Sequence, residues 1–181
     1  MDDDRIIVRT VEPGDVTYAN EIINEIESSA IVRGSGISKR SAKSIIEKID
    51  AGKAVIALTK TGEWVGFSYF EAWDNGEFVS NSGLIVSPQY RNQGVASRIK
   101  QQIFQLSRQK YPGAKVFSIT SGLAIMKMNT HLGFEPVTYS EIVKDETFWE
   151  GCKSCVNYNV LTSKNRCNCL CTAMLFDPNK N

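Results

Sequence analysis

Residues 84–99 read LIVSPQYRNQGVASRI, and this stretch carries the strongest structural signal in the chain. Its first three residues, Leu84–Val86, are apolar and predict a buried strand, which Ser87-Pro88 interrupts. Gly94 and Ala96 then lead into an amphipathic run that predicts a helix. A glycine turn that opens a helix presents unpaired backbone N–H groups at the positive end of the helix dipole. The stretch therefore predicts an anion site, and phosphate is the usual ligand of such sites.

The guanidinium group of Arg91 adds a permanent positive charge and several N–H donors beside this turn. The pattern is thus Arg-x-x-Gly-x-Ala after a strand that ends in Val-Ser-Pro. It resembles the pyrophosphate-binding signature of the GNAT superfamily of acyl-coenzyme A-dependent N-acyltransferases. A strand at 115–120, a helix at 123–132 and the step Gly133-Phe134 follow in the order that this family has. The resemblance covers residues 5–143.

The resemblance implies acetyl-CoA as the cosubstrate. Its pyrophosphate would lie on the amides of residues 93–96, and its pantetheine arm would pair with the backbone of residues 85–87. A backbone N–H near Val86 would meet the thioester carbonyl oxygen, which is worth about 3 kcal/mol in related oxyanion holes. The slot would open where two strands part at Ile85 and Phe117. The cofactor-binding residues expected on this basis are Ile85, Val86, Arg91, Asn92, Gln93, Gly94, Val95, Ala96 and Ser97.

The resemblance also implies an α/β (α+β) fold, a mixed and mostly antiparallel sheet with helices on both faces. The residue pattern predicts strands at 5–11, 54–58 and 63–73, with a further strand from Phe78. Helical spacing predicts one helix that Asp15 or Thr17 could cap and that ends before Gly34. A second helix is predicted at 39–51, and a hairpin at Asp74-Asn75-Gly76.

Length, charge and composition limit the classes of protein to which the chain can belong. A chain of 181 residues with a net charge of +1 favours a single domain and gives no electrostatic case for nucleic acid or an anionic membrane. No apolar run reaches the roughly 18 residues that a membrane span needs. The first five residues are acidic where a signal peptide would be basic. We expect a cytoplasmic protein whose five cysteines are thiols or metal ligands.

The proton-transfer residues depart from the family pattern. Many family members place a tyrosine four residues before the glycine of Gly-Phe, where it protonates the leaving thiolate, and Asn129 stands there in this chain. Tyr158 and Tyr139 are the candidate replacements, and each is also an ordinary aromatic residue. Glu71 is the best match by position for the base that removes the amine proton.

Glu77 is the alternative base, and both glutamates also fit solvated strand ends. His131, the only histidine, falls in the last turn of a predicted helix, where the helix dipole favours it without a catalytic role.

The loop between the first two helices shapes the acceptor pocket in the family. Here residues 31–40 read IVRGSGISKR, with three cations beside two glycines. An arginine in such a loop can hold a carboxylate through two parallel hydrogen bonds. We therefore predict that Arg33 contacts a small carboxylated amine such as an amino acid. The competing interpretation is a solvated basic loop ahead of the second helix.

All five cysteines fall within residues 152–171, in a segment that looks like an insertion (about 148–171) before a final strand at 169–176. A structural zinc site would use Cys152, Cys155, Cys169 and Cys171. Buried reduced thiols and a redox-sensitive pair are the two other interpretations.

The sequence thus predicts an N-acetyltransferase that moves an acetyl group from acetyl-CoA to a small-molecule amine, such as the amino group of glutamate. The transfer would be direct, in a ternary complex. The alternatives are a protein lysine or N-terminal acetyltransferase and a non-catalytic sensor of acetyl-CoA. A homodimer is compatible with the family, in which dimers are common.

Overall fold

The computed structural model describes residues 6–36 and 38–180, and within them seven strands form one sheet in the order β1-β2-β3-β4-β5-β7-β6. The strands are β1 (Ile6–Thr10), β2 (Ala54–Thr59), β3 (Trp64–Trp73), β4 (Phe78–Val86), β5 (Lys115–Thr120), β6 (Glu135–Val137) and β7 (Thr172–Phe176). The pairings are antiparallel except that of β4 with β5, which is parallel. This confirms the predicted mixed, mostly antiparallel sheet.

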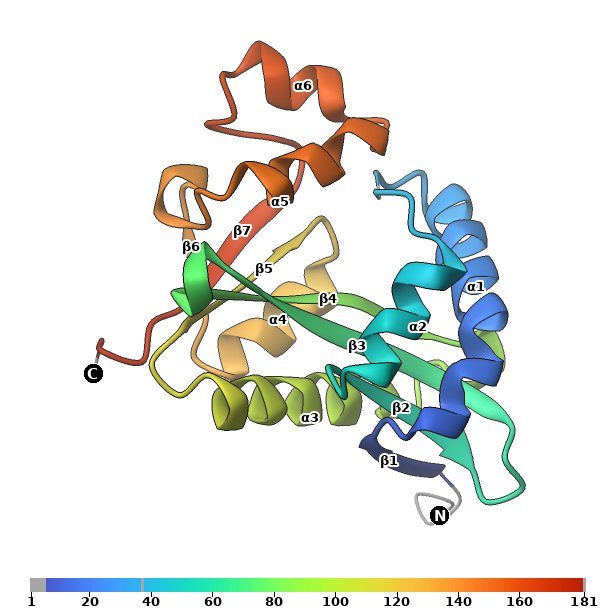
Figure 1. Ribbon diagram of the computed structural model, residues 1–181. Helices are drawn as coiled ribbons and strands as arrows, with labels where there is room; N and C mark the ends of the chain where they lie inside the picture. Colours follow the sequence, from blue (N-terminus) through green and yellow to red (C-terminus); the bar gives the residue numbers. More distant parts are fainter. Residues whose placement is uncertain (1–5, 37, 181) are drawn as a thin grey trace.

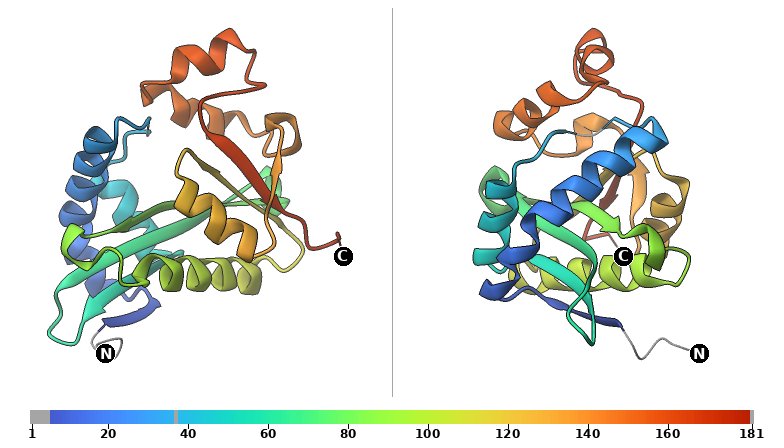
Figure 2. Two further views of the ribbon diagram at one scale, coloured as in Figure 1. Left: turned by 180° about the vertical axis from the view of Figure 1, so that it is seen from behind. Right: turned by 90° about the vertical axis from the view of Figure 1, so that its right-hand side faces the viewer.

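Helices cover both faces of the sheet, as predicted. The α-helices are α1 (Ala19–Arg33), α2 (Ala42–Asp50), α3 (Val95–Lys110), α4 (Leu123–His131), α5 (Glu146–Gly151) and α6 (Tyr158–Ser163). Figure 1 shows α1 and α2 on one face, and the reverse view in Figure 2 shows α3 and α4 on the other. The two short helices α5 and α6 lie beyond the end at which β7 begins.

The helix starts differ from the predicted ones for local reasons. The second helix begins at Ala42 because the Ser41 hydroxyl accepts a hydrogen bond from the Ser44 N–H at 3.1 Å, which makes Ser41 the cap. The first helix is preceded by the 3-10 turn η2 (Pro13–Tyr18), and Asp15 is buried inside that turn instead of capping α1. The predicted first strand is seen from Ile6 onward, and its first predicted residue lies outside the described ones.

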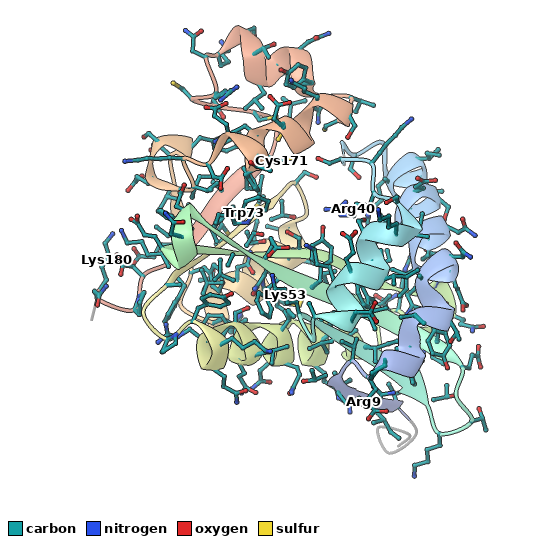
Figure 3. The ribbon with its side chains drawn as sticks, viewed as in Figure 1. Arg9, Arg40, Lys53, Trp73, Cys171 and Lys180 are labelled. Carbon is teal, nitrogen blue, oxygen red and sulfur yellow. The ribbon has the colours of Figure 1, made fainter. Side chains whose placement is uncertain are left out.

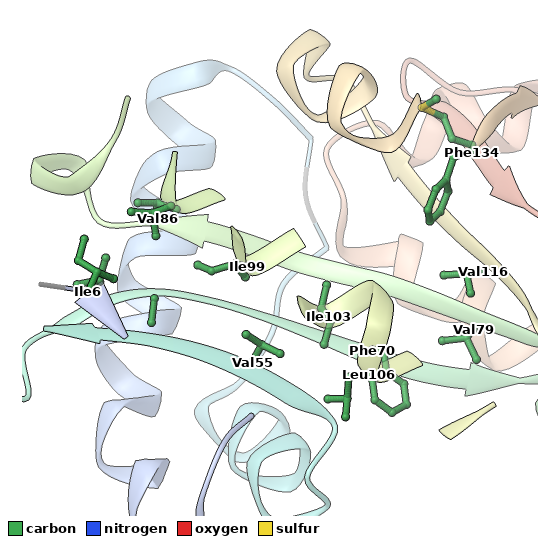
Figure 4. Packing of buried hydrophobic residues seen from close by; sticks show 14 of the residues in the cluster. Ile6, Val55, Phe70, Val79, Val86, Ile99, Ile103, Leu106, Val116 and Phe134 are labelled. Atoms are coloured by element: carbon green, nitrogen blue, oxygen red, sulfur yellow. The ribbon is translucent and has the colours of Figure 1, made fainter. Parts of the chain in front are cut away.

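Three groups of buried apolar side chains hold the layers together. The face of α3 predicted from the sequence packs on the sheet, and Figure 4 shows Ile99, Ile103 and Leu106 beside Val55 and Phe70. Full burial of an isoleucine side chain contributes about 2 kcal/mol. A second group joins α1 and α2 to β2 and β3, and a third packs the segment around α5 and α6 against β5 and β7.

The strands β4 and β5 pair over only three residues, and this opens the sheet. Their last pair is Ser80 with Phe117, while β4 continues along β3 as far as Val86. Gly83 adopts φ +66°, and an added Cβ there would lie 2.6 Å from the Tyr69 ring. The β3–β4 register shifts beside it, so β4 bends away from β5. We call the resulting space the β4–β5 opening.

The sequence analysis placed the parting at Ile85 and Phe117, which is wrong for Ile85. Phe117 does mark the parting, but its partner is Ser80, because the bulge near Gly83 bends β4 before Ile85 is reached.

Candidate functional site

A cavity of about 530 Å³ lies at the β4–β5 opening. Its walls come from the α1–α2 loop, from β4 and β5, and from the segment that carries α5 and α6. Among the described residues that line it are three cations, Arg33, Arg40 and Lys100, and no carboxylate. Serine, threonine and asparagine side chains make up much of the remaining polar wall. The cavity is therefore suited to anionic ligands.

Backbone groups lead from this cavity to the signature turn. Leu84 lines the cavity, and β4 continues from it through Ile85 and Val86. The Ser87 N–H donates to the Val65 carbonyl of β3 at 2.9 Å. Successive N–H groups of an extended chain point to opposite edges, so the Val86 N–H is directed to the edge that β5 leaves open. This is the donor that the sequence analysis expected for the thioester oxygen.

The signature turn ends at the start of α3. Gly94 is the residue that precedes the helix, with φ +78° in the left-handed region, and no side chain caps the helix. Asn92 also has a positive φ, of 62°. The first-turn amides of Val95, Ala96 and Ser97 have no partner within the helix, since the preceding turn lies outside it. The predicted anion site thus has the expected local geometry, although these residues lie beyond the walls of the cavity itself.

Arg91 is held by neighbouring protein groups. Its Nε donates to the Val86 carbonyl at 3.0 Å, and its Nη2 donates to Glu25 Oε1 and Ser29 Oγ of α1, each at 2.7 Å. These bonds fasten the signature turn to both β4 and α1. The sequence analysis expected Arg91 to bring its charge to the phosphates, but here the guanidinium is turned toward α1.

Two arginines, Arg33 and Arg40, line the same cavity. Arg33 is the last residue of α1 and is exposed at the rim. Arg40 is more constrained, because its Nε donates to the Tyr69 hydroxyl at 2.6 Å and its Nη1 donates to the Ser38 carbonyl at 3.0 Å. Figure 3 labels Arg40 and Cys171, which reach the cavity from opposite sides. Sequence reasoning named Arg40 only as part of the loop and chose Arg33 alone.

The predicted base does not line the cavity. Glu71 forms an ion pair with Lys48 and a second one with Lys53, at 2.6 Å, and its side chain is 18% exposed. Glu77 is also absent from the described lining. The structure therefore gives neither glutamate the position that the sequence analysis expected for the base. Alternation along β3 could not reveal the two lysines, because Lys48 comes from α2 and Lys53 immediately precedes β2.

The aromatic candidates do reach the cavity. Tyr158 and Tyr139 both line it. The Tyr139 hydroxyl donates to the Cys171 carbonyl at 2.8 Å, and burial, together with the neighbouring cysteines, raises the pKa of this phenol. Tyr139 is thus a poor proton donor at neutral pH.

Asn129 is fully buried on α4, and its Oδ1 has no hydrogen-bond partner in the described structure. His131 is exposed at the end of α4 as predicted, with its Nδ1 2.7 Å from the Lys127 carbonyl.

The zinc prediction is not supported. Within residues 6–36 and 38–180, no group of three or more His, Cys, Asp or Glu side chains is arranged to hold a metal ion. Cys152, Cys155, Cys169 and Cys171 are instead unpaired thiols along the cavity wall. Burial, followed by the neighbouring cysteines, raises the pKa of Cys152 and of Cys171 to about 11.

The final strand begins at Thr172, where pairing with Thr120 starts, and not at Cys169. Cys169 and Cys171 consequently lie outside the strand.

Sequence reasoning missed Lys100. It lies on α3 one residue beyond the apolar stripe, and its side chain reaches the cavity although the residue is only 2% exposed. Its Nζ lies 3.4 Å from Asn81 Oδ1 and 4.9 Å from the centre of the Phe134 ring. A lysine at the edge of an amphipathic stripe is usually solvated, so the sequence held no signal of its burial.

The described helices include none that is both long and apolar enough to cross a bilayer. No match was found among curated protein sequences. The model of the acetyltransferase (GNAT) family matches residues 22–134, which is more than half of the chain. The chain belongs to the GNAT family of acetyltransferases, as the signature indicated, and is an acyltransferase by family.

Solved structures share the fold. N-acetylglutamate synthase from Neisseria gonorrhoeae, complexed with coenzyme A and N-acetyl-glutamate, is 15% identical with a TM-score of 0.67, over 97% of this chain and 35% of that one. Rv2747 from Mycobacterium tuberculosis, in complex with CoA, is 17% identical with a TM-score of 0.65, over 94% of this chain and 98% of that one.

A phosphinothricin acetyltransferase from Sinorhizobium meliloti, in complex with acetyl-CoA, is 15% identical with a TM-score of 0.63, over 96% of this chain and 88% of that one. At these identities the likeness establishes the fold alone. This chain spans about a third of the length of the Neisseria synthase.

Proposed function

We propose that this chain transfers the acetyl group of acetyl-CoA to the amino group of a small carboxylated molecule, an amino acid such as glutamate. The observation that carries the proposal is the charge of the cavity, whose described lining includes three cations and no carboxylate. Both partners of the reaction carry anionic groups, the phosphates of CoA and the carboxylate of the amino acid. A cationic acceptor such as a basic peptide would meet like charge.

The cofactor would enter along β4. The amides at the start of α3 would bind its pyrophosphate, and the open edge of β4 would pair with pantetheine. A backbone N–H on the open edge of β4 would then polarise the thioester carbonyl. The amine must lose a proton during attack, and since the described cavity walls hold no carboxylate, that proton passes to water. The transfer is direct, from the thioester to the amine.

Arg40 and Arg33 would bind the acceptor carboxylate. Arg40 is already fixed by Tyr69 and Ser38, so it loses little side-chain freedom when it binds. Arg33, at the rim, would close on the carboxylate from the end of α1. The N-acetyl-glutamate bound to the Neisseria synthase, which has the same fold, supports an acceptor of this class.

Mass spectrometry of reaction products tests the proposal without thiol dyes, which would react with the cysteines. The protein is incubated with acetyl-CoA and with paired acceptors, each amino acid beside its carboxamide. We expect acetylation of one or a few amino acids and little acetylation of the matching amides. Equal reaction of acid and amide would contradict carboxylate recognition. CoA binding without any product would favour a macromolecular acceptor or the sensor.

Arginine variants locate the acceptor site. Arg40→Ala and Arg33→Ala should each raise the KM for the amino acid about tenfold or more, the worth of a charge-assisted hydrogen bond, with little change in CoA affinity. Lys39→Ala is the matched control, because Lys39 is an exposed cation of the same loop outside the described lining. An unchanged KM in both arginine variants would sink the assignment.

A further inference from the structure

Lys100 is a buried cation at the point where β4 and β5 stop pairing. Its hydrogen-bond partner Asn81 is the first β4 residue after the last β4–β5 pair, Ser80 with Phe117. Both Lys100 and Asn81 line the cavity. The amino group therefore lies where the two strands separate, and it comes from α3.

This lysine lacks the partner that a buried charge normally has. It is 2% exposed, its amino group donates to the Asn81 amide oxygen at 3.4 Å, and no acidic side chain of the described residues pairs with it. Burial lowers the pKa of Lys100 to about 7. An apolar residue of the same length would fill the space without this desolvation penalty. A destabilising ionisable group that faces a cavity is characteristic of functional sites.

The helix that carries Lys100 also carries the anion turn. Gly94 precedes α3, and Lys100 lies six residues later, which corresponds to about 9 Å along the helix axis. A pantetheine arm that starts at the turn and follows the open edge of β4 thus runs toward the Lys100 amino group. The cofactor's phosphate end and its sulfur end would both lie next to α3.

Several other ionisable groups of the wall are less suited to give up a proton. The Tyr139 proton is donated to the Cys171 carbonyl. The pKa values of Cys152 and Cys171 are raised by burial to about 11. Lys100 alone among these groups exchanges its proton readily near neutral pH.

We propose that Lys100 is the proton donor to the sulfur of CoA as the acetyl group leaves. The inference rests on the proposed function. The amine lone pair attacks the thioester carbonyl carbon, and the amine's proton passes to water. The carbon–sulfur bond then breaks with its electron pair on sulfur, the Lys100 ammonium gives that sulfur a proton, and neutral Lys100 regains a proton from solvent. The products are the acetylated amine and the CoA thiol.

The variant Lys100→Met tests the assignment, because methionine matches the length of the side chain without its charge. We expect kcat to fall about 100-fold, the usual worth of a positioned general acid. CoA affinity, measured by calorimetry, should stay within about threefold. The melting temperature should rise at pH 7, because the desolvation penalty is gone. Lower turnover in a more stable protein is a result that a purely structural lysine would not give.

Two further variants make the test decisive. Lys110→Met is the matched control, the same substitution at an exposed position of α3, and it should keep the wild-type kcat and melting temperature. Lys100→Gln serves as a second replacement, should the methionine variant fold poorly. Wild-type kcat in either folded Lys100 variant would overturn the proposal, and so would a loss of CoA affinity. A wild-type protein that acetylates no amine would instead overturn the proposed function.

Discussion

Asp15 is a single buried carboxylate on which the first turn of the chain depends. Its side chain is 5% exposed. It accepts hydrogen bonds from Nη1 and Nη2 of Arg9, at 2.8 and 2.9 Å, and from the Glu12 N–H at 2.7 Å. Burial alone would raise the pKa of Asp15, but the Arg9 and Glu12 bonds lower it overall. The sequence suggested Asp15 as a helix cap, because the pairing with β1 could not be read from local spacing.

Removal of this charge should destabilise the fold. Asp15→Asn keeps the shape of the side chain but weakens both Arg9 bonds, and we expect a loss of about 2 to 3 kcal/mol in the free energy of unfolding. Urea denaturation at pH 7 measures this loss. Glu12→Gln is the control, since Glu12 is 70% exposed and lies 3.8 Å from Arg9, and its change should stay below about 0.5 kcal/mol.

The Asp15 carboxylate also determines the direction in which the stability of the fold changes with pH. Because the pKa of Asp15 is lower in the folded state, its stabilisation is fully present above the unfolded value of about 3.9 and is lost as the pH falls through the folded value. The stability difference between wild type and Asp15→Asn should therefore be constant from pH 7 to 5 and shrink in stronger acid. A difference that grew on acidification would contradict this account.

At the scale of the element, the junction of β4 with α3 is the segment whose local structure the sequence predicted best. A local pattern is enough there, because strand, glycine turn and amphipathic helix follow one another within residues 84–99. The parting of β4 and β5, the start of β7 and the burial of Lys100 could not be predicted in this way. Each of these depends on contacts between segments that lie far apart in the chain.

Gly94 should be the most sensitive residue of this junction. Gly94→Ala places a side chain at φ +78°, which costs about 1 to 2 kcal/mol although nothing lies within 4 Å of the added carbon. The turn would relax, so the dissociation constant of CoA should rise about tenfold. Gly113→Ala, in open space without a positive φ, is the control and should bind CoA normally. Equal CoA affinity in the two variants would show that the turn does not bind the cofactor.

At the scale of the whole molecule, the β4–β5 opening divides the sheet into two parts. The strands β1 to β4 pack with α1, α2 and α3, whereas β5 and β7 pack with the segment around α5 and α6 on one face and contribute Val116 and Met174 to the α3 core on the other. Only three β4–β5 residue pairs join the two parts along the sheet. A ligand seated in the opening would touch both parts, so its binding should stabilise the fold as a unit.

CoA should accordingly raise the melting temperature. At a concentration 100 times its dissociation constant, a ligand that binds only the folded state adds about 2.7 kcal/mol. For a chain of this size the shift is about 5 to 10 °C, which scanning calorimetry resolves. Gly94→Ala should show a smaller shift at the same CoA concentration. A wild-type melting temperature that stays constant at high CoA concentration would mean that CoA does not bind the folded protein preferentially, and would contradict the proposed cofactor site.

The position of β7 has a consequence for how the protein is made. β7 is the last described strand in the chain, yet it lies inside the sheet, between β5 and β6. Fifty-one residues separate the end of β5 from the start of β7, which a ribosome needs about 3 to 10 s to add. Throughout that interval the outer edge of β5 lacks its neighbour, and an unpaired edge is a template for other chains. The nascent protein thus passes through a stage in which chaperones and aggregation compete for the same strand.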